Sequence, residues 1–175
     1  DTQELIRPMK PQKQRSIDFL GCAYNNKKGV EVVTSVFGIL SEMGYKCVHE
    51  CNIPRDRLFK VLDDSKILFY PSAADGMSRL VTEAALSGAY LVVSLDADPL
   101  VEQAGIFGGA AILTGLVSDL ENLKWDHRRS PREIASDLVR TLKFLRPAKT
   151  PPPFLWDVSV ETYGLARILM ERFGP

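Results

Sequence analysis

The chain has 175 residues, of which 45% are hydrophobic and 25% charged, a composition typical of one globular domain rather than a disordered segment. Lys plus Arg and Asp plus Glu both number 22, so the formal net charge is zero and no global field exists to attract nucleic acid or an anionic membrane. A local anion site stays open, since it needs only a few donors.

The cysteines and histidines favour neither a disulfide framework nor a metal site. Cys22, Cys47 and Cys51 are odd in number and form no C-x-x-C motif, which indicates a reducing, cytoplasmic compartment. His49 and His127 lie far apart and not at metal-ligand spacing. No apolar run approaches the roughly 18 residues of a membrane span. The polar opening DTQELIRPMKPQKQR is no signal peptide and lacks an initiating Met, so we expect an excised or processed piece of a longer protein.

Strands and helices alternate after a polar segment, residues 1–15, which carries two prolines and is expected to be a linker or an entry segment. An apolar run predicts the first strand at 16–22, and apolar residues at helical spacing predict a helix at 30–43. Alternating apolar residues predict a strand at 45–51. A proline in the first turn marks the next helix at 54–64.

The same alternation continues through the middle of the chain. The nearly continuous apolar runs at 66–72 and 90–95 predict strands buried on both faces, with a helix at 78–86 between them. A short helix at 99–104 and a last strand at 109–114 follow.

Two further helices are expected in the rest of the chain. The helix at 130–145 begins with S-P-R-E, which resembles a capping box, and the helix at 158–173 follows the stiff connector AKTPPP. Strands that alternate with helices predict an α/β fold, a Rossmann-like doubly wound parallel sheet with helices on both faces, formed by one domain at 16–175. Such sheets bind ligands at the carboxyl ends of their strands, so the loops there should carry the chemistry.

The strongest functional signal lies in residues 71–94. Gly76 lets the backbone approach a ligand closely, and a helix dipole favours a diphosphate at the helix start. The expected phosphate donors are the backbone N–H groups at that start and one side chain, those of Met77, Ser78 and Arg79. Two acidic residues, Asp75 and Glu83, flank this place and can accept hydrogen bonds from sugar and ribose hydroxyls.

Each of these residues also has a structural interpretation. The Gly turn can be a simple strand-to-helix connection, and Asp75 can cap the helix. Glu83 can be an acid that complements the helix dipole, and Arg79 can form a surface salt bridge. Lys27 and Lys28, a pair in the loop after the first strand, can be solvated surface.

The segment PSAADGMSRLVTEAALSGAYLVVS resembles the E-x7-E region of retaining GT-B glycosyltransferases of the group 1 type. Asp75 and Glu83 occupy the two acidic positions, with Gly76 and Gly88 in the same register, although Asp stands for the first Glu. The resemblance implies that Asp75 approaches the hydroxyls of the donor sugar and Glu83 those of the ribose.

Two more segments resemble the same family in the expected order. Residues 19–31, FLGCAYNNKKGVE, look like its F-x-G-R-x-x-x-x-K-G-x-E motif with one residue more, which implies that Lys28, or alternatively Lys27, binds the donor diphosphate. Cys22 stands where the family has an Arg. FLWDVSVETYGLARIL resembles the terminal helix that packs on the N-terminal domain of the family.

The resemblance implies the C-terminal half of a GT-B glycosyltransferase, which binds a nucleoside-diphosphate sugar and needs neither metal nor cofactor. Hexosyl transfer would then require an N-terminal acceptor domain, on the same or another chain, and this half alone would be inactive. The alternative is a degenerate, non-catalytic domain used as a scaffold, favoured by Cys22, by Asp96 and Asp98 after the strand at 90–95, and by a missing βα unit within residues 43–66. A dinucleotide enzyme is a weaker interpretation, because no G-x-G-x-x-G follows the first strand.

Overall fold

The computed structural model of the chain describes residues 9–73, 75–76, 78–95, 97–112 and 129–145. Five parallel strands form one sheet in the order β2-β1-β3-β4-β5, namely β1 (Ile17–Gly21), β2 (Cys47–His49), β3 (Ser65–Tyr70), β4 (Tyr90–Ser94) and β5 (Ala110–Ile112). The α-helices of the described residues are α1 (Val30–Glu42), α2 (Arg55–Asp64), α3 (Arg79–Leu86), α4 (Asp98–Ile106) and α5 (Pro131–Lys143). The Rossmann-like α/β fold expected from the sequence is confirmed.

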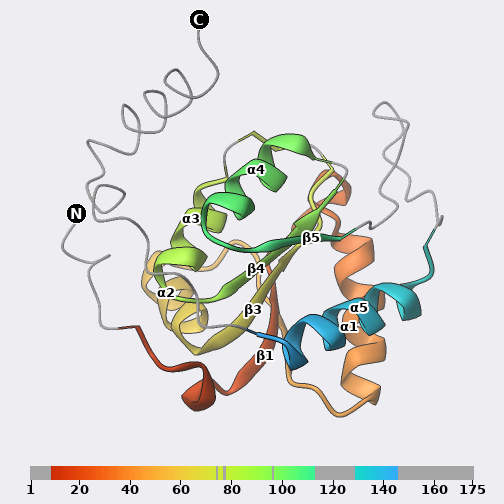
Figure 1. Cartoon of the computed structure of the whole chain (residues 1–175), viewed down its shortest axis with the longest axis horizontal. Coiled ribbons are helices and arrows are strands. Elements are labelled where there is room, and N and C mark those ends of the chain that lie inside the picture. Colours follow the sequence, from red (N-terminus) through yellow and green to blue (C-terminus); the bar gives the residue numbers. More distant parts are fainter. Residues whose placement is uncertain (1–8, 74, 77, 96, 113–128, 146–175) are drawn as a thin grey trace, which may run out of the picture.

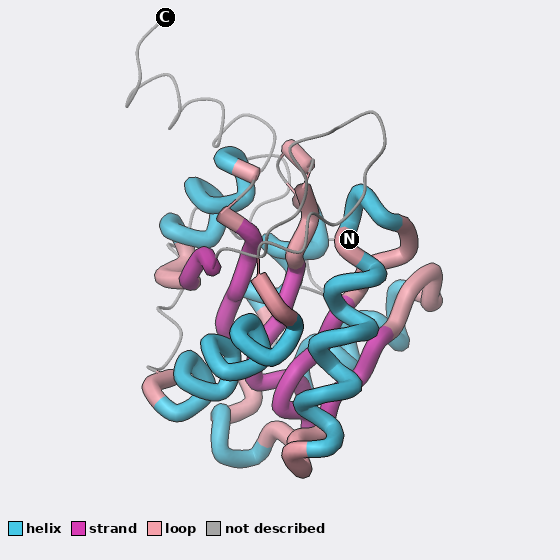
Figure 2. Tube along the Cα trace, turned by 90° about the vertical axis from the view of Figure 1, so that its right-hand side faces the viewer, coloured by secondary structure: helices cyan, strands magenta, loops and turns pink. Residues whose placement is uncertain are grey.

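Helices cover both faces of the sheet (Figures 1 and 2). The helices α1 and α5 pack together on one face, and α2, α3 and α4 cover the other. Successive residues of the central strand β3 therefore enter different cores: Phe69 packs with α1 and α5, whereas Leu68 packs with the three helices opposite. Both side chains are fully buried, which explains why this strand is a continuous apolar run in the sequence.

The carboxyl ends of all five strands meet at one edge of the sheet, because every pairing is parallel. The loops after the predicted strands thus share that edge, as expected. Strand β1 lies between β2 and β3, so the chain leaves β1 toward one side for β2 and returns to the other side for β3. The topological switch point, where ligands of such folds bind, lies between the carboxyl ends of β1 and β3.

The boundaries differ from the expected ones mainly at β2, which spans three residues rather than the predicted 45–51. The backbone N–H of Tyr45 donates to Leu40 in the last turn of α1, so the strand starts later. The helix α4 is longer than the predicted 99–104. Two short 3₁₀ turns, η2 (Gln12–Gln14) and η3 (Asn26–Lys28), carried no recognisable sequence signal. The helix predicted at 158–173 lies outside the described residues.

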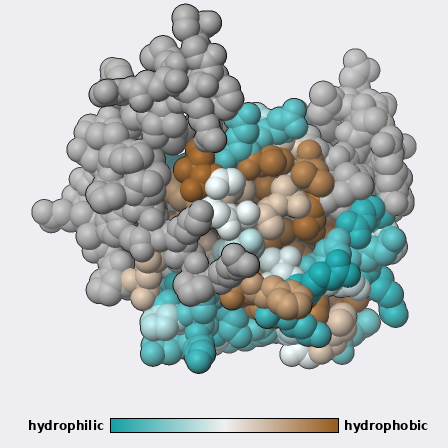
Figure 3. Space-filling model, in the orientation of Figure 1, coloured by the Kyte–Doolittle hydropathy of each residue, from teal (hydrophilic) through white to brown (hydrophobic). Residues whose placement is uncertain are grey.

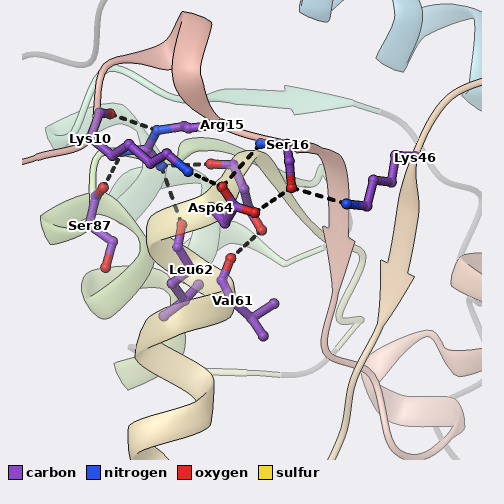
Figure 4. A network of polar contacts seen from close by, with 9 residues as sticks. Lys10, Arg15, Ser16, Lys46, Val61, Leu62, Asp64 and Ser87 are labelled. Carbon is purple, nitrogen blue, oxygen red and sulfur yellow. Dashed lines mark hydrogen bonds and ion pairs between the residues drawn. The ribbon is translucent and has the colours of Figure 1, made fainter.

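A polar network lies at the opposite, amino-terminal edge of the sheet (Figure 4). The buried guanidinium of Arg15 donates to four backbone carbonyls, those of Lys10, Leu62, Ser65 and Ser87. Burial lowers the pKa of Arg15, and the charges of Asp63 and Asp64 partly offset this effect. The segment that precedes β1 is thereby tied to the ends of α2 and α3.

The short edge strand β5 leaves apolar surface partly open. Its residues Ala110, Ala111 and Ile112 are half-buried, and Leu95 in the loop after β4 is 46% exposed. Figure 3 shows apolar surface gathered in the upper middle of the face on which Figure 1 shows α4 and β5.

Candidate functional site

The loops after β1 and β3 are joined at the switch point. The backbone N–H of Ala73 donates to the carbonyl of Lys27 over 2.9 Å, and the Ser72 hydroxyl donates to the same oxygen over 3.3 Å. Gly29 has a φ of +78° and lies against Pro71, where a Cβ would overlap the Pro71 carbonyl oxygen. This close approach sets the position of Lys28 beside the β3 loop.

Lys28 and Asp75 form an ion pair across these two loops, with 2.6 Å between Nζ and Oδ2. Both side chains are mostly buried, with 16% and 19% of their surface exposed. The hydroxyl of Tyr70, the last residue of β3, donates to the same Asp75 oxygen over 2.7 Å. Burial raises the pKa of Tyr70, and the hydrogen bond to Asp75 raises it further, so the phenol keeps its proton and remains a donor.

Glu83 forms a second cluster at the same edge. Its side chain is 7% exposed, and its Oε1 accepts hydrogen bonds from Arg55 Nη2 and Arg79 Nε, each over 2.9 Å. The pKa of Glu83 is raised above its ordinary value, because the effect of burial exceeds the opposite effect of the charge and hydrogen bond of Arg79. The two arginines belong to different helices, so the carboxylate connects α2 to α3.

The start of α3 is hydrogen-bonded to α4. The backbone N–H of Ser78 donates to Gln103 Oε1 over 2.9 Å, and Gln103 Nε2 donates to the Ser78 carbonyl and to Thr82 Oγ1, each over 2.8 Å. Gly76, by contrast, is exposed, and a Cβ placed there would meet no described atom within 4 Å. Met77 lies outside the described residues.

Cys22 brings no charge to the site, although the family that the sequence resembles has an Arg at this position. The side chain is half-buried. Its pKa is raised to about 12, mainly by burial and further by the nearby carboxylate of Glu50. The thiol is therefore neutral near pH 7. All three cysteines of the chain are free.

No protein-family model matches the chain, and no curated protein is significantly similar to it. The family resemblance therefore rests on the sequence motifs. Among the described residues, no group of three or more His, Cys, Asp or Glu side chains could hold a metal ion. None of the helices in the described part of the chain is long and apolar enough to span a membrane.

The structure brings the expected site residues together as two pairs, Lys28 with Asp75 and Arg79 with Glu83. Three contributors were missed from the sequence, namely Tyr70, Arg55 and Gln103. The strand-loop-helix pattern could have placed Tyr70 and Arg55 at the carboxyl edge, since one ends a strand and the other begins a helix, but it does not indicate their side-chain partners. Gln103 is a polar residue at helical spacing from the buried Leu100 and beside the buried Ala104, a signal of a buried hydrogen-bonding role.

Proposed function

We propose that this chain is the donor-binding half of a GT-B glycosyltransferase and binds a nucleoside-diphosphate sugar. The observation that carries the proposal is the Lys28–Asp75 ion pair at the switch point between β1 and β3. Two residues expected to bind different parts of the same ligand come from separate loops and meet where ligands of this fold bind.

The pair suits exchange with a charged, hydroxyl-rich ligand. A diphosphate would take Lys28 as its counter-ion, and sugar hydroxyls would donate to Asp75, so each residue would replace its present partner by one from the ligand. Tyr70 would keep Asp75 in position through its hydrogen bond. Gly76 leaves the ligand room to approach the backbone.

Glu83 is held ready to accept ribose hydroxyls. Arg55 and Arg79 both donate to Oε1, and Oε2 accepts no hydrogen bond within the described residues. A hexosyl transfer would be completed with an N-terminal acceptor domain, and Lys28 would stabilise the negative charge on the departing diphosphate.

The second candidate function, a non-catalytic scaffold, is favoured by partners that some of these groups already have. Gln103 accepts the Ser78 N–H, which would otherwise face a phosphate, and a neutral Cys22 stands in the place of a cation. A scaffold would bind no nucleotide.

Calorimetry with UDP, GDP and ADP tests the proposal. We expect at least one of these nucleotides to bind with micromolar to millimolar affinity, about −8 to −4 kcal/mol. Lys28→Gln and Glu83→Gln should each weaken binding by about 10-fold or more, because each removes a charge-assisted hydrogen bond. Asp75→Asn should matter less, since a plain diphosphate has no sugar for Asp75 to contact.

Lys13→Gln is the matched control, because it removes the same charge from an exposed residue at the opposite edge of the sheet. The nucleotide affinity of Lys13→Gln should equal that of the wild type within about twofold. Absence of heat with all three nucleotides at millimolar concentration would overturn the donor-binding proposal in favour of the scaffold. Binding that is insensitive to both Lys28→Gln and Glu83→Gln would place the site elsewhere.

A further inference from the structure

Two arginines share one buried carboxylate at the carboxyl edge of the sheet. Arg55 is the first residue of α2 and Arg79 the first of α3, and these two helices lie against each other on one face of the sheet. Both donate to the same oxygen, Glu83 Oε1. The cluster therefore carries two positive charges against one negative charge.

The exposure of the three side chains shows how the cluster is layered. Glu83 is 7% exposed, whereas Arg55 is 45% and Arg79 67% exposed, so the carboxylate lies underneath and the guanidinium groups face solvent. The Arg55 guanidinium also lies 5.2 Å from the centre of the buried Phe59 ring, which limits its movement. Glu83 and Phe59 thus hold two cations in place from below.

Each arginine keeps hydrogen-bond donors for a ligand. Arg55 contacts Glu83 through Nη2 and Arg79 contacts it through Nε, and neither guanidinium has another hydrogen-bond partner within the described residues. A guanidinium presents five N–H donors in a planar fork that matches phosphoryl oxygens. A phosphoryl group offers three acceptor oxygens and can engage both forks at once, which a two-oxygen carboxylate does less well.

We propose that Arg55 and Arg79, held by the buried carboxylate of Glu83, form a binding site for the phosphoryl group of a ligand. The site shares Arg79 and Glu83 with the donor site proposed above, but it adds Arg55 and requires no nucleotide. Two acidic residues close to Arg55 along the chain do not neutralise the positive charge of the site. Glu50 is paired with Arg57, and the exposed Asp56 side chain projects from α2 about 100° away from Arg55.

A purely structural cluster makes a different prediction. If the Arg55–Glu83 pair only ties α2 to α3 and the Arg79–Glu83 pair only stabilises α3, removal of either arginine changes stability and leaves anion binding as it was. The two possibilities are therefore separated by measuring ligand affinity on variants whose fold is confirmed by circular dichroism.

The test is an NMR titration with inorganic phosphate in a low-chloride buffer, followed at the backbone amides of α2 and α3. We expect saturable binding that weakens about 10-fold or more in both Arg55→Gln and Arg79→Gln. Arg57→Gln is the matched control, because it makes the same change two residues along α2 at an arginine paired with Glu50 instead. It should bind phosphate within about twofold of the wild type.

Two further measurements complete the test. Arg79→Lys keeps the charge but loses the planar fork, so its phosphate affinity should fall between those of the wild type and Arg79→Gln. Competition between UDP and phosphate would assign the site to the phosphates of a nucleotide, and simultaneous binding would assign it to a second phosphorylated ligand. Equal phosphate affinity in the wild type, Arg55→Gln and Arg79→Gln would overturn the inference even if nucleotides bind through Lys28. Phosphate binding that depends on both arginines would support it even if no nucleotide binds.

Discussion

The charged side chains at the carboxyl edge of the sheet form ion pairs with residues from other loops and helices. Lys28 and Asp75 would be unremarkable loop residues if their loops did not meet, and their ion pair exists because Gly29 packs against Pro71. Arg79 forms the salt bridge that its sequence position allowed, but its partner Glu83 is also held by Arg55 from another helix. The partners that the fold brings to a charged side chain therefore indicate more about its function than its charge does.

Asp64 offers a direct test of this view at the amino-terminal edge of the sheet (Figure 4). Burial alone would raise the pKa of Asp64, but hydrogen bonds from Lys10 and from the hydroxyl and backbone N–H of Ser16 lower it from 3.8 to about 2. A lowered pKa stabilises the fold above the pKa of the unfolded chain, and this stability is lost as the pH falls from about 4 to about 2.

Asp64→Asn should therefore lower the free energy of unfolding by about 1 kcal/mol at pH 7, a value that allows for screening by solvent at this partly exposed side chain. The difference from the wild type should shrink as the pH approaches 2. Urea unfolding at several pH values measures it. Asp56→Asn, an exposed change on the same helix, should cost less than about 0.5 kcal/mol and serves as the control. A difference that stays constant from pH 7 to pH 2 would contradict the assignment.

At the scale of one element, the helix α1 begins and ends with a glycine in the left-handed region. Gly29, its N-cap residue, has φ +78° and no room for a Cβ, whereas Gly44, after its last turn, has φ +87° and open space around it. The two positions share a backbone conformation and differ in packing. They can therefore separate the cost of the conformation from the cost of the contact between the β1 and β3 loops.

We expect Gly44→Ala to lower the free energy of unfolding by about 1 kcal/mol, the cost of a left-handed alanine. Gly29→Ala should cost about 3 kcal/mol or more, because the methyl group also collides with the Pro71 carbonyl and must move the β3 loop. Urea unfolding of both variants measures these values. Equal losses would show that the two loops are not held by this contact, and the Lys28–Asp75 pair would lose its structural support.

At the scale of the whole molecule, the fold could be predicted from the sequence because the strands are short apolar runs and the helices carry apolar residues at helical spacing. The parallel sheet, the helices on both faces and the shared edge of the loops all derive from that alternation. The order of the strands does not, since local patterns carry no information on which strands are neighbours. Boundaries were less accurate at β2, where helix-end hydrogen bonding competes with the strand for Tyr45.

The candidate site was predictable in residue type and only partly in arrangement. The sequence motif indicated acidic and basic residues at one edge of the sheet, and both Lys28 and Glu83 are there. It contained no sign that Gln103 would occupy the Ser78 N–H or that Arg55 would reach Glu83, because both contacts join elements that are distant along the chain. Side-chain pairs between separate elements depend on packing geometry, which periodicity does not encode.

The central strand predicts how the whole molecule unfolds. Phe69 belongs to the core under α1 and α5 and lies 6.3 Å from Phe37 between ring centres, whereas Leu68 belongs to the core under α2, α3 and α4. Both are fully buried on one strand that is hydrogen-bonded to β1 and β4. Loss of either core should therefore release the strand that the other core needs, and the sheet should unfold as one unit.

We expect Phe69→Ala to lower the free energy of unfolding by about 3–5 kcal/mol and Leu68→Ala by about 2–5 kcal/mol, because each leaves a cavity in a close-packed core. Native-state hydrogen exchange should then show the slowest amides of β1, β3 and β4 losing protection by that same free energy in each variant, whichever face is altered. Phe144→Ala, the same change at a side chain that is 76% exposed, should shift protection by less than about 0.5 kcal/mol. If Leu68→Ala left the amides of α1 fully protected, the two faces would open independently. The loops after β1 and β3 would then belong to two separate units. Opening of either face would release the Lys28–Asp75 pair, on which the proposed donor site depends.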